Sequence, residues 1–218
     1  MKIKTDYITA STGTKIPVEI EVKRTTRAVA IKHSTKDKDI RNGWCNAGGL
    51  TCAKYGARPC CPPKTKMLSE MKERKYLYLV HVKIDIDDYY DVYPKVKASK
   101  SWQYFGMDGT HKMTRNVSNK IVRAMTDKAQ GDVPFRVGGC LGCQYAKTGK
   151  CIYFMPPLES SGINVVDITK EVFDSQIVWR EPKKSMPYMI AVGAIYSDRT
   201  NMSIKNFKGA ILNACNHK

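Results

Sequence analysis

The residues of this chain that could carry chemistry are its cysteines. Seven of the eight cysteines fall into two groups, Cys45, Cys52, Cys60 and Cys61 and, later in the chain, Cys140, Cys143 and Cys151. Thiolates are soft ligands that suit zinc and iron–sulfur clusters. The N-terminus has no apolar stretch of the kind that a secretory signal needs, so we expect a reducing, cytoplasmic location. In that compartment, clustered cysteines are more often metal ligands than disulfide partners.

The spacing of the cysteines favours an iron–sulfur cluster over zinc. Two residues separate Cys140 from Cys143 in a glycine-rich turn, which lets both sulfurs wrap one metal centre. A zinc ribbon would need a second such pair, but six residues lie between Cys45 and Cys52 and eight between Cys52 and Cys61. Neither group contains a histidine. We therefore expect a [4Fe–4S] cluster, with zinc as the alternative.

The residues around these cysteines resemble a known family. The similar stretches are CAKYGARPCCPP at 52–63, YLYLVHVKIDI at 76–86, the glycine–cysteine turn at 139–143 and PPLESSGINV at 156–165. They are similar to an uncharacterised cysteine-rich family described as predicted metal-binding proteins, and the similarity runs over about 44–196. The resemblance implies an iron–sulfur or zinc protein with no settled activity.

The resemblance also implies which cysteines are metal ligands. Six of them match the family's two motifs: Cys45, Cys52, Cys61, Cys140, Cys143 and Cys151. Cys60 stands where the family has a small non-ligand residue, and Ala146 stands where it has a further cysteine. The second group thus supplies three ligands to a cluster that takes four. Either Cys60, Cys61 or Cys215 completes it, or one iron stays open to water or substrate, or the two groups form separate centres.

The other residues must supply the elements that position these cysteines. Period-two alternation and β-branched runs predict strands at 15–22, 28–31, 76–86, 134–137 and 188–196. Helical spacing of apolar residues predicts helices at 64–76, 114–129, 168–175 and 204–214, and polar stretches predict loops at 34–41 and 87–94. This order predicts an α/β or α+β fold with a mixed sheet and flanking helices. We expect an N-terminal β segment at 1–43 and a cysteine-rich metal-binding domain at 44–218.

The charge of the chain points to a polyanionic partner. Lys and Arg number 37 against 20 Asp and Glu, which gives a net charge of +17. Between 94 and 130 there are eight Lys or Arg against two Asp, with Trp102 and other aromatic residues interleaved. The expected nucleic-acid-binding residues are Lys95, Lys97, Lys100, Trp102, Lys112, Arg115, Lys120, Arg123 and Lys128. Aromatic side chains among basic ones suit unpaired bases, which favours RNA over DNA.

Three functions are consistent with these features. The first is a metalloprotein that binds nucleic acid, the second an iron–sulfur enzyme that acts on RNA or nucleotides in sulfur transfer, sulfur removal or another modification, and the third a redox or electron-transfer module. The net charge supports the first independently of the resemblance. The sequence has no nucleophile–base pair, phosphate loop or dinucleotide fingerprint. The longest apolar run, 189–196, is far shorter than the ~20 residues of a membrane span, so we expect no membrane partner.

Two other residues with chemical potential are expected to be structural. Cys215, which stands alone near the C-terminus, is expected to pack in a helix. His81 lies in the apolar run at 76–86 and is expected to be a core histidine whose ring nitrogens are hydrogen-bonded.

Overall fold

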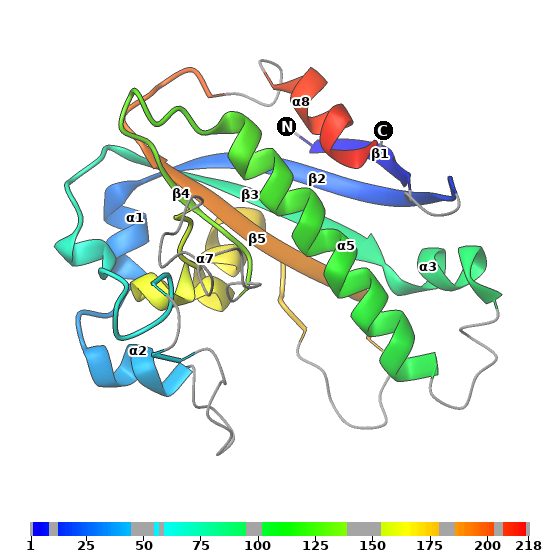
Figure 1. The fold of residues 1–218 in the computed structure, drawn as a ribbon, viewed down its shortest axis with the longest axis horizontal. Helices are drawn as coiled ribbons and strands as arrows, with labels where there is room; N and C mark the ends of the chain where they lie inside the picture. The colour runs from blue at the N-terminus through cyan, green and yellow to red at the C-terminus, as the bar shows by residue number, and fades with distance from the viewer. Residues whose placement is uncertain are drawn as a thin grey trace.

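The computed structural model describes residues 2–8, 13–44, 55–56, 59–94, 102–138, 154–178, 186–202 and 207–216, with the backbone alone at 102–108. Five strands form one antiparallel sheet in the order β1–β2–β3–β5–β4 (Figure 1). The strands are β1 (Lys2–Ile8), β2 (Lys15–Thr26), β3 (Tyr76–Asp85), β4 (Val133–Phe135) and β5 (Tyr188–Ser197). The helices are α1 (Arg27–Lys32), α2 (Lys38–Trp44), α3 (Ile86–Val92), α5 (Trp102–Met125), α7 (Val165–Phe173) and α8 (Lys208–Cys215), with 3-10 turns η2 (Leu68–Glu70) and η3 (Glu159–Ser161).

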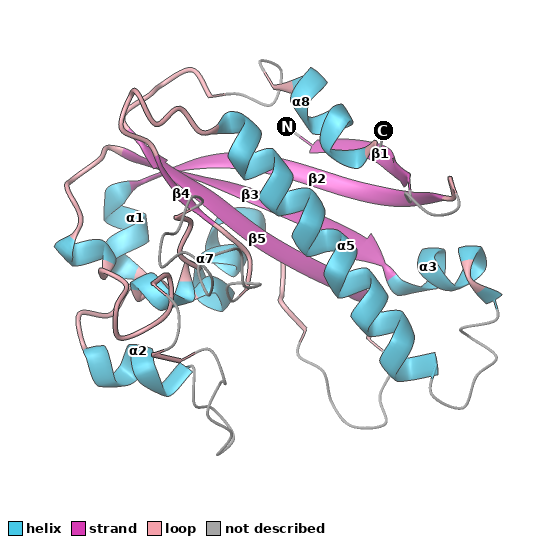
Figure 2. Cartoon of the chain, in the orientation of Figure 1, coloured by secondary structure: helices cyan, strands magenta, loops and turns pink. Residues whose placement is uncertain are grey.

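Both faces of the central strands are buried. Side chains alternate between the two faces of a strand, so Tyr78 and Val80 enter one hydrophobic core while Leu77 and Leu79 enter the other. Helix α5 lies diagonally across the first face with α8 beside it, and α7 lies behind the sheet (Figure 2). The sheet is therefore a layer between helices, which is the architecture expected of strands that are apolar on both faces.

The α+β alternative of the predicted fold class is confirmed, but the sheet is antiparallel rather than mixed. Strands β3 and β4 run in the same direction, joined through α5. Strand β5 inserts between them and runs the opposite way, so each neighbouring pair of described strands is antiparallel. The N-terminal strands belong to this same sheet, because β2 pairs with β3 over residues 19–26.

Several predicted elements are confirmed and others are wrong. The strands expected at 15–22, 76–86, 134–137 and 188–196 and the helices at 114–129, 168–175 and 204–214 are present with shifted ends. The strand expected at 28–31 is helix α1, because the Thr26 hydroxyl accepts a hydrogen bond from the Val29 N–H and caps a helix. The loop expected at 87–94 contains α3, whose first turn has Asp87 and Asp88 at the end where the helix dipole favours carboxylates. The loop expected at 34–41 contains the start of α2.

The helix expected at 64–76 is wrong. Only the short turn η2 forms there, and Met67 and Met71 on either side of it have extended backbones. The Thr65 carbonyl, which a helix would offer to a later backbone N–H, instead accepts a hydrogen bond from the Arg41 guanidinium at 2.9 Å. The Glu70 carboxylate accepts the Met67 N–H at 2.8 Å, which closes the turn. Contacts with distant residues therefore override the local helical spacing.

His81 is a core residue, as expected, but its ring is not hydrogen-bonded. It is 3% exposed, and within the described part of the chain neither ring nitrogen has a hydrogen-bond partner. The ring packs on Phe173 with 4.8 Å between centroids. Burial lowers the pKa of His81 to about 4, so the ring is neutral at pH 7.

Gly193 of β5 packs closely against α5 and gives a test of the fold. A Cβ there would lie 2.9 Å from both the Ser118 hydroxyl oxygen and a Val122 methyl carbon. We expect Gly193→Ala to lower the free energy of unfolding by about 1–3 kcal/mol, measured by urea denaturation. Gly209→Ala is the control, because that glycine is exposed in α8 and a Cβ added there would meet no neighbouring atom within 4 Å. It should be neutral or slightly stabilising, and equal stability of the two variants would contradict the packing of α5.

Candidate metal centre

The structure positions the chain on either side of the two cysteine groups. Cys60, Cys61 and Cys215 are described and buried. The other predicted ligands lie outside the described residues: Cys45, Cys52, Cys140, Cys143 and Cys151. Within the described ranges, no three Cys, His, Asp or Glu side chains are grouped to hold a metal ion. The geometry of the site therefore comes from the segments that flank the cysteines.

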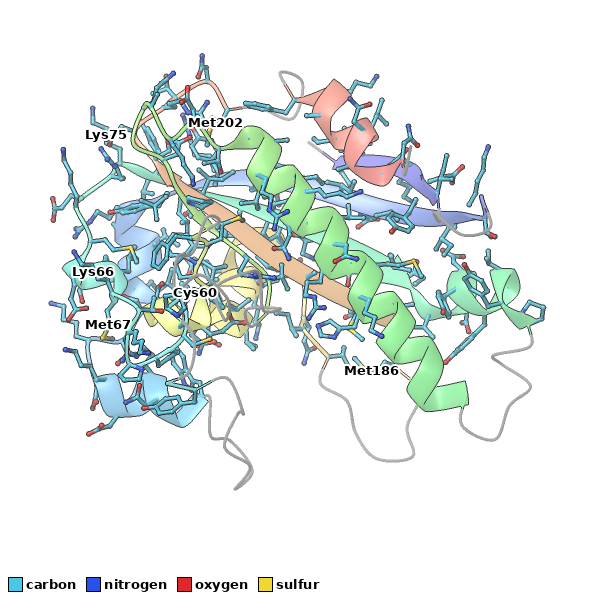
Figure 3. All side chains as sticks on the ribbon, viewed as in Figure 1. Cys60, Lys66, Met67, Lys75, Met186 and Met202 are labelled. Atoms are coloured by element: carbon cyan, nitrogen blue, oxygen red, sulfur yellow. The ribbon has the colours of Figure 1, made fainter. Side chains whose placement is uncertain are left out.

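Arg41 ties the start of the first cysteine group to its end. Helix α2 ends at Trp44, one residue before Cys45. Within α2, the Arg41 side chain is only 1% exposed and donates to the Thr65 carbonyl. The Thr65 hydroxyl donates to the Pro59 carbonyl at 3.5 Å, which orders the turn that carries Cys60 and Cys61. In Figure 3, Cys60 lies between α2 and the sheet.

The described residues on either side of the second cysteine group are joined to one another. After β4, the Arg136 N–H donates to the Pro156 carbonyl at 3.0 Å, and Arg136 forms a β-bridge with Pro157. The Val137 N–H donates to the Asn119 side-chain oxygen at 2.9 Å, which fixes the same point to α5. All three cysteines of the second group fall between these two joined segments.

The segments that flank the two groups meet. The turn η3 begins two residues after Pro157 and packs against α2. The Thr35 N–H donates to the Gly162 carbonyl at 2.8 Å, and the Asn164 N–H donates to the His33 carbonyl at 2.8 Å. Residues 33–44, which precede Cys45, and residues 159–164, which follow Cys151, are therefore held against one another, although more than a hundred residues separate the two segments in sequence.

The charged groups around this junction favour thiolates. The guanidinium groups of Arg41 and Arg136 are buried, and Arg115 of α5 is half-buried beside Gly138. Burial and the charge of Arg136 both lower the pKa of Arg115. Nearby cations stabilise a deprotonated thiol and an anionic thiolate-bound metal. Burial raises the pKa of Glu159 in η3, which limits the negative charge nearby. The residues present fit a thiolate-bound metal.

Cys215 lies in a different part of the molecule. It is fully buried in α8, in the hydrophobic core that also contains Tyr7 and Ile211. Burial raises the pKa of its thiol to about 11. Helix α8 is well separated from α2 (Figure 1) and from Cys60 (Figure 3). Cys215 thus packs in a helix as expected, and this position gives no support to a ligand role.

The predicted nucleic-acid-binding residues divide into three sets. Lys112, Arg123 and Lys128 are exposed on or just after α5. Arg115 and Lys120 are half-buried, and the Lys120 ammonium group donates to the Ala214 carbonyl of α8 at 3.4 Å. The remaining ones, Lys95, Lys97, Lys100 and the side chain of Trp102, lie outside the described residues.

Sequence reasoning missed a cavity at the C-terminal end of α5. It has a volume of about 640 Å³ and is lined by Arg123, Lys128, Met155, Arg199 and Phe207 among others. Arg199 pairs with the buried Asp132 and so shapes the wall without a free charge. These residues come from four distant segments, and no local pattern in the sequence could have grouped them.

Sequence reasoning also missed two buried arginines in the described segments that flank the cysteine groups, Arg41 and Arg136. Burial distinguishes them from the other basic residues, and burial of a single arginine leaves no signal in the sequence.

Comparisons with known proteins give one family match. A family model described as "Predicted metal-binding protein (DUF2284)" matches residues 27–193. None of the curated proteins and none of the solved structures matches the chain. In the part of the chain that the structure describes, no helix has the length and apolar character needed to cross a membrane.

Proposed function

Since this chain belongs to the family of predicted metal-binding proteins, with most of its length matched, we propose that it is an iron–sulfur protein whose two cysteine segments bind a [4Fe–4S] cluster. The observation that carries the proposal is the contact between the flanking segments, in which η3 packs on α2. This contact supports a single centre that takes thiolates from both groups. The wide cysteine spacings favour a cluster over a single tetrahedral ion.

Metal analysis tests the nature of the centre. Protein purified without oxygen should be brown and contain iron and acid-labile sulfide, with the absorption of a [4Fe–4S] cluster. Dilution into aerobic buffer should bleach the colour as the cluster is oxidised. Colourless protein with stoichiometric zinc would overturn the iron–sulfur proposal and leave a thiolate-bound zinc centre in its place.

We further propose that the protein binds nucleic acid, RNA in preference to DNA, through its basic surface. The net charge of +17 supports an electrostatic contribution from phosphate contacts. The exposed basic residues on or just after α5, Lys112, Arg123 and Lys128, are the described candidates for that surface. Lys120 is a weaker candidate than the sequence suggests, because its ammonium group is already bound to a backbone carbonyl of α8.

The salt dependence of binding tests this surface residue by residue. Replacing Lys112, Arg123 or Lys128 with alanine should each reduce the slope of log affinity against log salt by about 0.7 on single-stranded RNA. Lys120→Ala is the matched control and should leave the slope unchanged, since its ammonium group donates to Ala214. Anisotropy titrations over a salt series measure both. Background affinity at low salt on single-stranded RNA, duplex RNA and duplex DNA would contradict the proposal and favour a redox module.

A further inference from the structure

Two arginines beside the second cysteine loop have buried guanidinium atoms without partners. Arg136 is 8% exposed, and its Nε atom is buried with no hydrogen-bond partner among the described residues. The Nε atom of Arg115 is buried and unpartnered in the same way. No described carboxylate forms an ion pair with either side chain, whereas other arginines such as Arg27 and Arg74 each have one.

The two guanidinium groups act on one another. Burial lowers the pKa of Arg115, and the charge of Arg136 lowers it further, so the two cations lie within electrostatic range of one another. They converge on the same turn: Arg136 precedes it by two residues, and the Arg115 Cδ lies 3.4 Å from where a Gly138 Cβ would be. A larger residue at 138 would crowd the Arg115 side chain. Gly138, which has a φ of +66° and no side chain, leaves room for the guanidinium.

A buried cation beside a half-buried one is unfavourable unless a negative group joins them. The adjoining segment, 139–153, contains two lysines and no Asp or Glu. The thiolate centre proposed above supplies diffuse negative charge, but among the described residues neither Nε atom has a hydrogen-bond acceptor. A bound anion would supply such an acceptor.

We propose that Arg115 and Arg136 form a binding site for an oxyanion, a phosphate or carboxylate group of a ligand that lies beside the metal centre. The planar guanidinium fork matches the oxygens of such groups in bidentate geometry, which a diffuse metal–thiolate charge does not use. Arg115 is half-buried and Arg136 is buried, so Arg115 is the more solvent-accessible of the two. The proposal goes beyond metal binding and beyond phosphate contacts on the outer face of α5.

The test compares anion binding to the metal-loaded protein and to arginine variants. The probes are inorganic phosphate, succinate and adenosine 5′-monophosphate, each titrated at constant ionic strength with chloride as the replaced ion. Binding is read from the rise in melting temperature with anion concentration and by calorimetric titration. Arg115→Gln and Arg136→Gln should each weaken binding about ten-fold or more. The ranking of the three probes distinguishes a phosphate from a carboxylate ligand.

The control is Arg27→Gln, which removes an arginine that already pairs with Glu73 at 2.8 Å. It should leave anion affinity unchanged. Without added anion, Arg136→Gln should be at least as stable as the unmodified protein, because it removes a buried charge that has no partner. A purely structural arginine would instead lower the stability in both conditions, so that result would contradict the proposal.

Two results would overturn the proposal. One is anion binding that is equal in the unmodified protein and in the double variant Arg115→Gln/Arg136→Gln. The other is the absence of binding of all three probes together with a change in reduction potential in the variants, which would assign the pair to charge balance at the cluster.

Arg115→Lys and Arg136→Lys retain the charge and cover the case in which a glutamine variant does not fold. They should still weaken binding, because the fork is lost. Metal content measured on every variant separates loss of the anion site from loss of the centre.

Discussion

Cys52→Ser and Cys140→Ser are each expected to lose the metal and most of the soluble yield. Each change removes a thiolate from one of the two cysteine groups, and a hydroxyl is a poor replacement for a soft ligand. The residues around these cysteines are rich in glycine and proline and lack the periodicity of a helix or strand. Metal binding should therefore supply part of the free energy that orders them. Iron and sulfide content and yield, measured on anaerobic preparations, check the prediction.

Cys215→Ser is the matched control for these variants. This substitution also replaces a cysteine sulfur by oxygen, but Cys215 belongs to α8 and lies in the hydrophobic core. Replacing the thiol by a hydroxyl there should cost about 1–2 kcal/mol of folding free energy and leave the metal content unchanged. Metal loss equal to that of Cys52→Ser would instead make Cys215 a ligand. Full metal retention in Cys140→Ser would remove the second group from the centre.

Arg41→Met is expected to destabilise the protein by about 2–4 kcal/mol and to speed release of iron to a chelator. The guanidinium is buried and donates to the Thr65 carbonyl and to the Asn42 side-chain oxygen. Methionine fills much of the same space but cannot donate, so the buried Thr65 carbonyl loses its partner. The turn that carries Cys60 and Cys61 then loses its tie to α2. Urea denaturation and the rate of iron transfer measure the two effects.

Lys38→Ala controls for loss of a positive charge in the same helix. Lys38 lies one turn earlier in α2, and its exposed ammonium group pairs with Glu70 at 3.3 Å. Exposed pairs of this kind contribute less than about 1 kcal/mol. Iron release should match that of the unmodified protein. Equal release rates in Arg41→Met and Lys38→Ala would show that the Arg41 tie does not order the cysteine turn.

The sequence predicts the elements whose periodicity is long and unbroken. Enough apolar positions recur at a regular period to define both the type of secondary structure and its buried face in β3, in β5 and in the second half of α5. The short apolar run at 28–31 does not, because four residues fit a strand or a helix equally well. Its outcome depends on the Thr26 cap and on the Arg27 N–H, which donates to the distant Lys75 carbonyl. Likewise, the segment at 64–76 has helical spacing, but Arg41 takes the carbonyl that a helix would use.

The candidate site, like the fold, can be predicted from the sequence only in part. Cysteine spacing and the family resemblance identify the ligand candidates, because a metal centre restricts residue type and separation along the chain. They do not identify Arg41 or Arg136. The sequence does not distinguish a buried arginine from an exposed one, and these two are among 37 basic residues. Lys120 shows the converse: it looks like a phosphate contact in sequence and is a link between two helices in the structure.

The order of strands in the sheet has a consequence for how the protein is made on the ribosome. Among the described strands, β4 pairs with β5 alone, and β5 follows it in the chain by more than fifty residues. β4 precedes the segment that contains the second cysteine group. That segment is therefore anchored to the sheet only after residues 188–197 have left the exit tunnel. If both cysteine groups bind one centre, as we propose, the first group lacks the remaining thiolates until that point. Metal loading would then be a late step that follows synthesis of nearly the whole sequence, and the nascent chain would be open to oxidation or to binding of a wrong metal for most of its translation.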